Sequence, residues 1–221
     1  MISMFTQLNI IQPVDIKSKD TSSGRFYTTP DGHKYPSITT ILGSEPKQAV
    51  LDWRQSLGNI KADKETKRAT ERGTAVHLMI EHYLNNSQDP TKDHKIEYIN
   101  EFKKLKLLLK NINNILAQEI AVYSDTMKIA GRVDCVAEYK NKLAIIDFKT
   151  STNNKNTNMI TDYYLQTTFY ALAIQELYNI HIEDIVIIMS VEKGLPLLFT
   201  EKVDNWIEPL LIKIHKYYTK Q

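Results

Sequence analysis

Residues 93–148 pass directly from a long helical pattern into β-rich sequence, and this order constrains the fold more than any other feature of the chain. Over 93–116, apolar side chains recur every three or four residues, which predicts one amphipathic helix with a buried stripe. The stripe consists of Tyr98, Phe102, Leu105, Leu109, Ile112 and Leu116. Three β-rich segments then predict strands over 119–124, 129–139 and 143–148, the last two joined by a tight turn at 141–142. We therefore expect a helix followed by a three-strand meander.

The C-terminal part of the chain continues with alternating helices and strands. An apolar-rich segment over 159–178 predicts a helix, and 184–191 has the composition of a buried strand. A turn at Gly194 separates that strand from another at 197–201, and a helix at 205–218 closes the chain. The resulting order αβββαβ predicts an α/β fold with a mixed central sheet flanked by helices.

The N-terminal part combines one short strand with helices of increasing length. A strand is expected over 25–29, and Ser37 is positioned to cap a short helix that ends at Gly43. The segment 46–58 opens on proline and ends on glycine, which predicts a second helix. Residues 60–84 contain no proline and end in apolar residues at helical spacing, which predicts a long helix.

Composition excludes several classes of protein. The 221 residues include one cysteine, Cys135, so the chain can form neither an internal disulfide nor a thiolate-based iron–sulfur or structural zinc site. No apolar run approaches the roughly 18 residues that a spanning helix needs, and the first 24 residues lack a targeting signal. We therefore expect a cytoplasmic protein with no membrane partner, folded as one domain over 1–221.

Two acidic residues and a lysine carry the strongest chemical signal. Asp147 and Lys149 are two residues apart at the end of a strand, so both side chains point to one face. Asp134 lies inside the preceding strand, where an acidic side chain is costly unless it is paired or binds a metal. Across the short hairpin the two aspartates can approach each other and offer oxygen ligands suited to Mg²⁺ or Mn²⁺. Beside a lysine, this arrangement suits hydrolysis of a phosphodiester bond.

These residues lie in motifs that resemble the PD-(D/E)xK nuclease superfamily. The motifs are G-R-V-D at 131–134 and I-I-D-F-K-T at 145–150. Gly73 with His77, and Gln166 with Tyr170, are similar to the additional motifs of the RecB-like branch. Residues 26–42 further resemble the mitochondrial genome maintenance exonucleases and their bacteriophage relatives. The resemblance implies a restriction-endonuclease-like core over 91–221 with an N-terminal strand and helical arch over 1–90.

The resemblance also implies roles for individual residues. The implied metal ligands are His77, Asp134, Asp147 and the carbonyl group of Phe148. The residues implied to be catalytic are Lys149, Asp134, Asp147, Gln166 and Tyr170, of which the last two support the site or contact nucleic acid. The cofactor would be Mg²⁺ or Mn²⁺, and an imidazole ligand favours Mn²⁺ somewhat. The four-cysteine iron–sulfur site of several RecB-like nucleases is absent from this sequence.

The net charge of +2, from 28 Lys and Arg against 26 Asp and Glu, means that an anionic ligand must be held by a local patch. A candidate is a basic stripe along the predicted helix at 60–84, formed by Lys61, Lys64, Arg68 and Arg72. As a lone signal the stripe is better interpreted as a solvated face, but beside a nuclease core it would guide a phosphate backbone. Glu119 is interpreted as a solvated strand end, with a place near the site as the alternative. Trp53 is either a packing anchor or a base-stacking residue.

The resulting hypothesis is a metal-dependent DNA exonuclease, with single-stranded DNA preferred over duplex and an end required. It would act in replication, recombination or repair in a bacterial or phage-infected cell. One alternative is a structure-specific or restriction-type endonuclease built on the same core, which a closed circular substrate would reveal. Another is a non-catalytic nucleic-acid-binding module, against which the intact Asp134, Asp147 and Lys149 argue.

Overall fold

A five-stranded mixed sheet forms the centre of the molecule. The computed structural model describes residues 4–45 and 47–220. The strand order is β4-β5-β6-β7-β8, in which β6 and β7 are parallel and the other neighbours are antiparallel. The strands are β4 (Ile112–Ser124), β5 (Ile129–Tyr139), β6 (Lys142–Ser151), β7 (Asp184–Val191) and β8 (Leu197–Lys202). The predicted fold class, a mixed sheet flanked by helices in the order αβββαβ, is confirmed.

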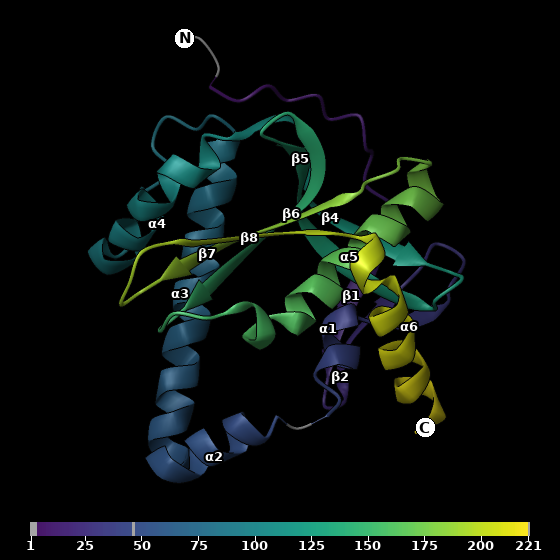
Figure 1. Cartoon of the computed structure of the whole chain (residues 1–221), viewed down its shortest axis with the longest axis horizontal. Helices are drawn as coiled ribbons and strands as arrows, with labels where there is room; N and C mark the ends of the chain where they lie inside the picture. The colour runs from purple at the N-terminus through teal and green to yellow at the C-terminus, as the bar shows by residue number, and fades with distance from the viewer. Residues whose placement is uncertain (1–3, 46, 221) are drawn as a thin grey trace.

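The described residues form six helices, five of which pack against this sheet (Figure 1). They are α1 (Ile38–Leu42), α2 (Gln48–Leu57), α3 (Asn59–Leu84), α4 (Ile96–Leu109), α5 (Thr161–Tyr178) and α6 (Asp204–Thr219), with a 3₁₀ turn at Thr157–Met159 before α5. α3 and α4 pack on one face of the sheet, and α1, α5 and α6 pack on the other. The N-terminal half of α3 extends past the sheet together with α2 (Figure 1).

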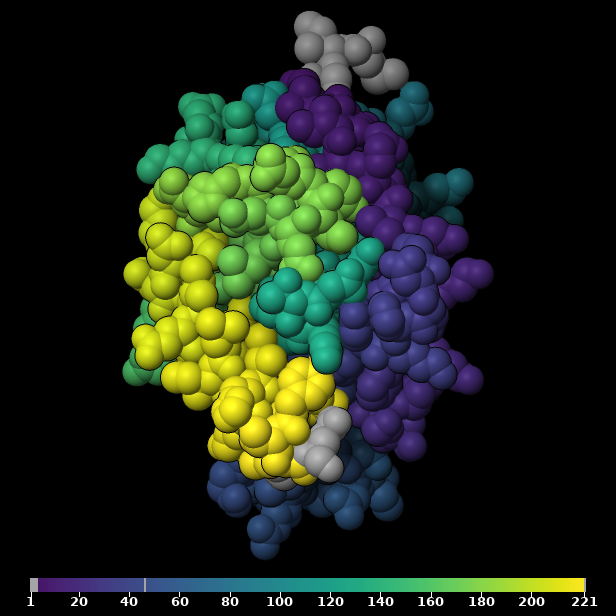
Figure 2. Space-filling view, turned by 90° about the vertical axis from the view of Figure 1, so that its right-hand side faces the viewer, coloured from purple at the N-terminus to yellow at the C-terminus, as the bar shows by residue number. Residues whose placement is uncertain are grey.

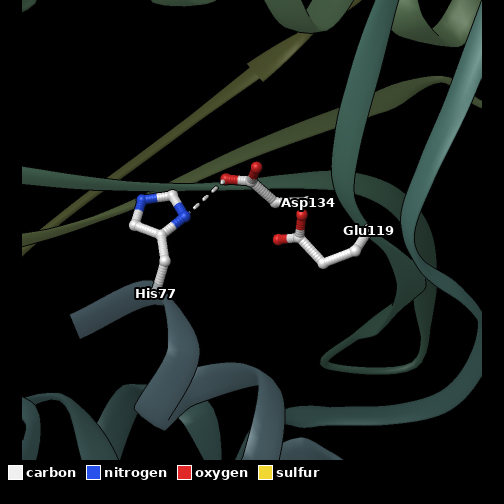
Figure 3. A group of neighbouring side chains, drawn as sticks. All are labelled: His77, Glu119 and Asp134. Carbon is white, nitrogen blue, oxygen red and sulfur yellow. Dashed lines mark ion pairs between the residues drawn. The ribbon is translucent and has the colours of Figure 1, made fainter. Parts of the chain in front are cut away.

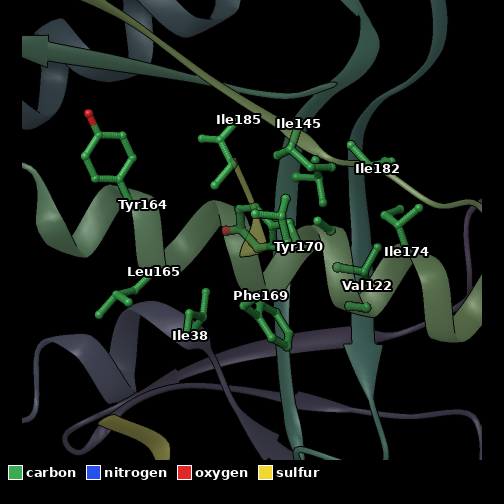
Figure 4. Close-up of a cluster of buried hydrophobic side chains, with 14 of the residues drawn as sticks. Ile38, Val122, Ile145, Tyr164, Leu165, Phe169, Tyr170, Ile174, Ile182 and Ile185 are labelled. Carbon is green, nitrogen blue, oxygen red and sulfur yellow. The ribbon is translucent and has the colours of Figure 1, made fainter. Parts of the chain in front are cut away.

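Two apolar cores hold the layers together, one on each face of the sheet. On one face, apolar residues of α5 such as Phe169 and Ile174 pack against Ile145 and Ile185 of the sheet (Figure 4). On the other, α3 and α4 bury their apolar stripes against alternate residues of β5, β6 and β7. Because successive strand residues point to opposite faces, the central residues of β6 and nearly all of β7 are buried on both faces of the sheet. Among the described residues, no helix has the length and apolar character needed to cross a bilayer.

A small antiparallel sheet in the N-terminal part packs against the outer end of β5. It contains β1 (Lys17–Thr21), β2 (Gly24–Thr28) and β3 (Lys34–Pro36). The expected strand at 25–29 corresponds to β2, whereas β1 escaped prediction because it is exposed and polar along its length. In Figure 2 the teal turn between β4 and β5 lies between the N-terminal part and the yellow α6. The hydroxyl group of Tyr35 donates to Asp125 of this turn at 2.7 Å and joins the two sheets.

The predicted helix over 93–116 is wrong at its C-terminal end. α4 stops at Leu109, and Ile112 and Leu116 belong to β4. The strand bulges between Asn113 and Ala117, where the register with β5 shifts and Asn114 has a positive φ of 46°. A bulge inserts an extra residue, so Ile112 and Ile115, three residues apart, pack on the same face of the sheet and imitate helical spacing, whereas Leu116 packs on the other face.

Other predicted elements agree with the structure to within a few residues. Ser37 caps α1 by accepting a hydrogen bond from the Thr40 N–H, and Gly43 ends that helix as expected. The β5–β6 turn is centred on Lys140 and Asn141, both with positive φ, one residue earlier than predicted. Pro46, the expected start of the second helix, lies outside the described residues, and α2 begins at Gln48.

Candidate active site and metal centre

The site lies where β5 and β6 separate. Their antiparallel pairing ends with Cys135 opposite Ile146, so Asp134 and Asp147 come next on the two strands and face each other across the opening. The expectation that these aspartates approach each other across the hairpin is confirmed, since Oδ2 of Asp134 accepts a hydrogen bond of 2.8 Å from the N–H of Phe148, the residue after Asp147. Strand separation therefore opens a space between two carboxylates at the centre of the sheet.

The backbone of Phe148 points into the same opening. Its N–H donates a hydrogen bond of 2.8 Å to Oδ2 of Asp134, which replaces the missing strand pairing. Because the N–H and C=O of one strand residue point to the same side, the Phe148 carbonyl group also points toward β5 and Asp134. The carbonyl therefore has the orientation that the predicted metal ligation requires.

Asp147 and Lys149 form a buried ion pair on the face covered by α5. Lys149 Nζ contacts Oδ2 of Asp147, whose side chain is 1% exposed. Burial raises the pKa of the Asp147 carboxyl group, and the Lys149 charge opposes that rise only in part. Burial by itself lowers the pKa of the Lys149 ammonium group, but the carboxylates of Asp147 and Asp134 outweigh it and the pKa rises. Lys149 is therefore held as a cation beside a carboxylate that is costly to keep ionised.

α3 brings His77 to the opposite side of the opening. Nδ1 of His77 lies 3.7 Å from Oδ2 of Asp134 (Figure 3), and its ring meets Phe148 edge-on with ring centres 6.2 Å apart. The helix approaches the sheet closely at Gly73, where an added Cβ would lie 3.4 Å from Oγ1 of Thr150. An added Cβ would make an ordinary van der Waals contact with Thr150, so α3 lies about one methyl group from the sheet here, and His77 follows one turn later against the carboxylates.

Glu119 completes a row of three carboxylates across the sheet. The pairs Gln118 with Cys135 and Ile120 with Val133 place it directly opposite Asp134 on β4. It is half-buried rather than a solvated strand end, so the sequence-based interpretation is wrong on this point. Burial, reinforced by the nearby Asp134 charge, raises the pKa of Glu119 to about 7. The signal available in the sequence was its strand register with Asp134, but the bulge at 113–117 hid it.

The side chains present fit a divalent cation. One ligand atom each from His77, Glu119 and Asp134 can be chosen so that all lie within 4.8 Å of one another (Figure 3). The two carboxylate oxygens of Asp147 are buried and have no hydrogen-bond partner among the described residues, apart from the contact that Lys149 makes with Oδ2. Buried carboxylate oxygens without donors are costly, and a cation would satisfy them. One imidazole and three carboxylates form a donor set suited to Mn²⁺ or Mg²⁺.

Gln166 and Tyr170 lie on the face of α5 that covers the site. Nε2 of Gln166 donates to the Tyr170 hydroxyl group at 2.8 Å, and both side chains are buried. Burial raises the pKa of Tyr170 well above its ordinary value, with a further contribution from the Asp147 charge. Gly131 leaves room for the tyrosine ring, since a Cβ there would lie only 2.6 Å from Cε1 of Tyr170. The pair is therefore buried within the protein, and its two expected roles, support of the site or contact with nucleic acid, stay predictions.

The predicted basic stripe on α3 does not form a continuous surface. Arg72 is 2% exposed and contacts Glu192 just after β7, so its predicted role as a phosphate-binding residue is wrong. Arg68 makes two hydrogen bonds to Glu192, at 2.8 and 3.0 Å, and a third to Glu65. These pairs tie α3 to the end of β7. Of the four residues, Lys61 and Lys64 remain exposed, at the far end of the helix from His77.

Two hollows adjoin the site along α3. The first, of about 540 Å³, is lined by His77, Glu119 and Asp134 together with Arg25 and Arg132. The second, of about 570 Å³, lies between α2, α3 and the end of β6, and its lining includes residues 53, 66, 70, 150 and 152. Residues 66, 70, 73 and 77 are three or four apart and share one helical face, so this face of α3 connects both hollows.

Sequence comparison identifies relatives of this chain. Mitochondrial genome maintenance exonuclease 1 from Mus musculus is 26% identical over 217 residues, which cover 91% of this chain and 64% of that protein. The Homo sapiens protein of the same name is 26% identical over 202 residues, covering 84% of this chain and 59% of its own length. The chain thus spans less than two thirds of the length of these curated relatives.

A solved structure and a family model also match this chain. A putative exonuclease from Eubacterium rectale superposes with a TM-score of 0.47 and 10% identity, covering 69% of this chain and 65% of its own. The model of the PD-(D/E)XK nuclease superfamily matches residues 51–189, which is more than half of the chain and includes His77, Asp134, Asp147 and Lys149. This chain therefore belongs to the PD-(D/E)XK nuclease superfamily.

Proposed function

We propose that this chain is a divalent-metal-dependent DNA exonuclease, built as one nuclease domain over 1–221. The observation that carries the proposal is the position of Asp134, which faces Glu119 on one neighbouring strand and Asp147 on the other, with His77 3.7 Å away. Lys149 adds a cation on the same face as Asp147. Opposite charges gathered in this way match the needs of phosphodiester hydrolysis, in which negative charge develops on the phosphate.

His77, Glu119, Asp134, Asp147 and the Phe148 carbonyl group would hold the cation. When bound, Mg²⁺ or Mn²⁺ supplies positive charge at the phosphate and increases the acidity of water in the site. A nitrogen ligand favours Mn²⁺ somewhat over Mg²⁺. The Phe148 N–H fixes the Asp134 carboxylate, so this oxygen donor is oriented before any cation arrives.

Lys149 acts on the attacking water and on the phosphate. Its ammonium group is held by Asp147, with the Tyr163 ring centre 5.1 Å from Nζ, so Nζ has a defined position. From there it donates hydrogen bonds that orient the water oxygen and stabilise the charge of the transition state. In the reaction the water oxygen forms a bond to phosphorus, the bond from phosphorus to the leaving sugar oxygen breaks, and a proton passes to that oxygen.

A single strand fits the surroundings of the site better than a duplex. Trp53 of α2 is 39% exposed and lines the second hollow, where its ring is available for a base to stack on it. The shared face of α3 leads from there past Gly73 to His77, and the extension of α2 and α3 beyond the sheet forms the proposed arch (Figure 1). We infer a path for one strand along this face, with its end at the metal centre. The relatives' name, genome maintenance exonuclease, supports a role in DNA replication, recombination or repair.

A cleavage assay tests the proposal. Purified protein is incubated with linear single-stranded, linear duplex and closed circular DNA, each with Mg²⁺, Mn²⁺ or EDTA. We expect metal-dependent shortening of linear single strands with circles left intact, and no cleavage by Lys149→Ala or Asp134→Ala. Lys142→Ala, which removes an exposed lysine from the start of the same strand, is the matched control and should retain full activity.

The alternatives give different results in the same assay. Cleavage of closed circles would establish an endonuclease and keep the site. Binding of DNA without cleavage of any substrate by the wild type would contradict the enzymatic proposal. Activity that persists in Lys149→Ala and Asp134→Ala would show that the assigned site is wrong.

A further inference from the structure

The cations that face the metal centre come from parts of the chain outside the basic stripe predicted for α3. Arg68 and Arg72 are occupied by Glu192, which leaves the first hollow without a contribution from either of them. Arg25 of β2 and Arg132 of β5 line this hollow together with His77, Glu119 and Asp134. Two strands that are distant in sequence thus bring guanidinium groups to one opening.

Arg132 has a fixed relationship to the metal centre through its own strand. It precedes Asp134 by two residues on β5, and both residues line the first hollow. The Arg132 side chain is 55% exposed, and Nη1 lies 3.8 Å from Oε2 of Glu119. That distance is too long for a hydrogen bond, so the donors of this guanidinium group remain available.

The backbone of Arg25 is fixed by hydrogen bonds, whereas its side chain can change its ion-pair partner. Its N–H donates to Oγ1 of Thr40 at 2.9 Å, and its carbonyl group accepts from the Ser37 N–H at 2.8 Å, which fixes β2 against α1. The guanidinium group pairs with Asp20, but both side chains are at least half exposed. The pair has two hydrogen bonds, of 2.8 and 3.2 Å, but solvent screens its attraction, so a polyanion with a phosphate at every linkage can displace the carboxylate.

The negative charge of the first hollow requires cationic groups if a nucleic acid is to bind there. Glu81, Glu119 and Asp134 place three carboxylates at the opening through which a polyanion must enter. A cation at the metal centre compensates for this charge locally, but the neighbouring phosphates of a nucleic acid still face acidic groups. Arginine suits this position because its planar fork binds a phosphate with two parallel hydrogen bonds.

We propose that Arg25 and Arg132 form a phosphate clamp that holds the backbone of the substrate strand beside the scissile linkage. Arg132 binds the phosphate next to the one at the metal centre, and Arg25 binds the one beyond it. This inference rests on the proposed nuclease function, because it assigns a substrate path to the same site. It replaces the α3 stripe as the place where this chain contacts the nucleic-acid backbone near the reaction.

Salt dependence of binding tests the clamp directly. A fluorescent single-stranded oligonucleotide is titrated with protein in Ca²⁺ at several salt concentrations, for wild type, Arg25→Gln, Arg132→Gln and Lys103→Gln. Lys103 is an exposed residue of α4 outside both hollows and serves as the control. Each lost phosphate contact should reduce the slope of log K against log salt by about 0.7 and weaken binding about tenfold. The control should shift neither quantity.

A neutral backbone linkage locates the contact. In oligonucleotides with one methylphosphonate at successive positions, cleavage by the wild type should be slowed when the neutral linkage lies next to the scissile one. Arg132→Gln should lose this sensitivity at that single position, with a raised KM and a kcat within about twofold of wild type. If Arg132 only neutralised the charge of Glu119, Arg132→Gln would change the affinity for metal. The dependence of cleavage on the methylphosphonate position would then be the same as in wild type.

The outcomes separate this inference from the proposed function. Wild-type cleavage combined with unchanged salt slopes and methylphosphonate profiles in both arginine variants would overturn the clamp and leave the nuclease intact. Absence of cleavage by the wild type on every substrate would contradict the nuclease proposal itself. Reduced slopes in that second case would still support phosphate binding by Arg25 and Arg132.

Discussion

The ammonium group of Lys149 contacts the carboxylate of Asp147 in an almost fully buried pair beneath α5. Removal of one member leaves the other as a buried charge without compensation, which typically costs about 3–5 kcal/mol. We expect Lys149→Met to lower the free energy of unfolding by about this amount in EDTA at pH 8. Part of the loss should be recovered in the double variant with Asp147→Asn. Urea denaturation measures both effects, and Lys142→Met is the control on the same strand.

Addition of Mn²⁺ provides the contrasting condition for this pair. A cation bound beside Asp147 compensates its charge, so the stability difference between Lys149→Met and wild type should become smaller with metal. A difference that stays the same in EDTA and in Mn²⁺ would contradict the assignment of Asp147 as a metal ligand.

Arg72 and Glu192 join α3 to the end of β7 through a largely buried ion pair. Glu101, which accepts a hydrogen bond of 2.6 Å from Ser190, lies 3.9 Å from Nε of Arg72 on the other side. We expect Arg72→Met to destabilise the protein by about 3–5 kcal/mol, because it leaves these carboxylates without their cation. Arg72→Lys should recover little, since a single ammonium group cannot replace the guanidinium fork.

A double-mutant cycle checks that this stabilising effect comes from the pair. Arg72→Met combined with Glu192→Gln should destabilise less than the sum of the two single substitutions. Additive effects would show that Arg72 acts through packing alone. Binding of single-stranded DNA to the folded fraction of Arg72→Met should match wild type, because a buried arginine does not contact the substrate.

The raised pKa of Glu119 predicts a pH-dependent stability in the metal-free protein. Its ordinary value is 4.5 and burial raises it to about 7, so between these values the folded state binds a proton that the unfolded state has released. This contribution to stability is therefore lost as pH rises from about 4.5 to 7, and it stays constant above that range. Glu119→Gln removes the effect, so the variant should gain on the order of 2 kcal/mol relative to wild type across this window.

Thermal unfolding in EDTA at pH 5, 6, 7 and 8 measures this difference. Glu97→Gln, an exposed acidic residue of α4, is the control and should show no comparable trend. A Glu119→Gln advantage that is the same at all four pH values would disprove the assigned cause. In Mn²⁺ the order should reverse, because the variant lacks one carboxylate ligand.

The absence of a side chain at Gly131 is required by Tyr170. An alanine Cβ at 131 would lie 2.6 Å from Cε1 of a tyrosine ring that is buried and bonded to Gln166. We expect Gly131→Ala to destabilise by about 1–3 kcal/mol, the usual cost of an overpacked core. In a Tyr170→Leu background the same substitution should cost clearly less, and urea denaturation of the four proteins measures the coupling. Equal costs in both backgrounds would show that the clash is relieved elsewhere.

Local patterns in the sequence predicted much of the sheet and of the site. Strand alternation is a local property, so the placement of Asp147 and Lys149 on one face followed from their spacing of two. The position of Asp134 opposite Asp147 followed from the short β5–β6 hairpin, which leaves little freedom of register. The order of helices and strands from 93 onward followed from apolar periodicity in the same way.

Features that depend on the meeting of distant segments could not be predicted. A bulge at 113–117 gave β4 a helical spacing and hid the register that places Glu119 beside Asp134. The α3 stripe was composed of cations in the sequence, but Glu192, which lies about 120 residues later, buries Arg72 and pairs with Arg68.

The sequence by itself determined the elements of the core and the identity of the Asp134, Asp147 and Lys149 group, because side-chain direction within a strand is set by local geometry. Only the tertiary structure decided which further charges meet this group. Glu119 of β4, Arg25 of β2 and Arg132 of β5 line one hollow together with His77 of α3, which the family resemblance had implied, whereas Arg72 is buried. Which charged side chains lie near this group depends on the distances between helices and strands, because Coulomb interactions and desolvation act through space and not along the chain.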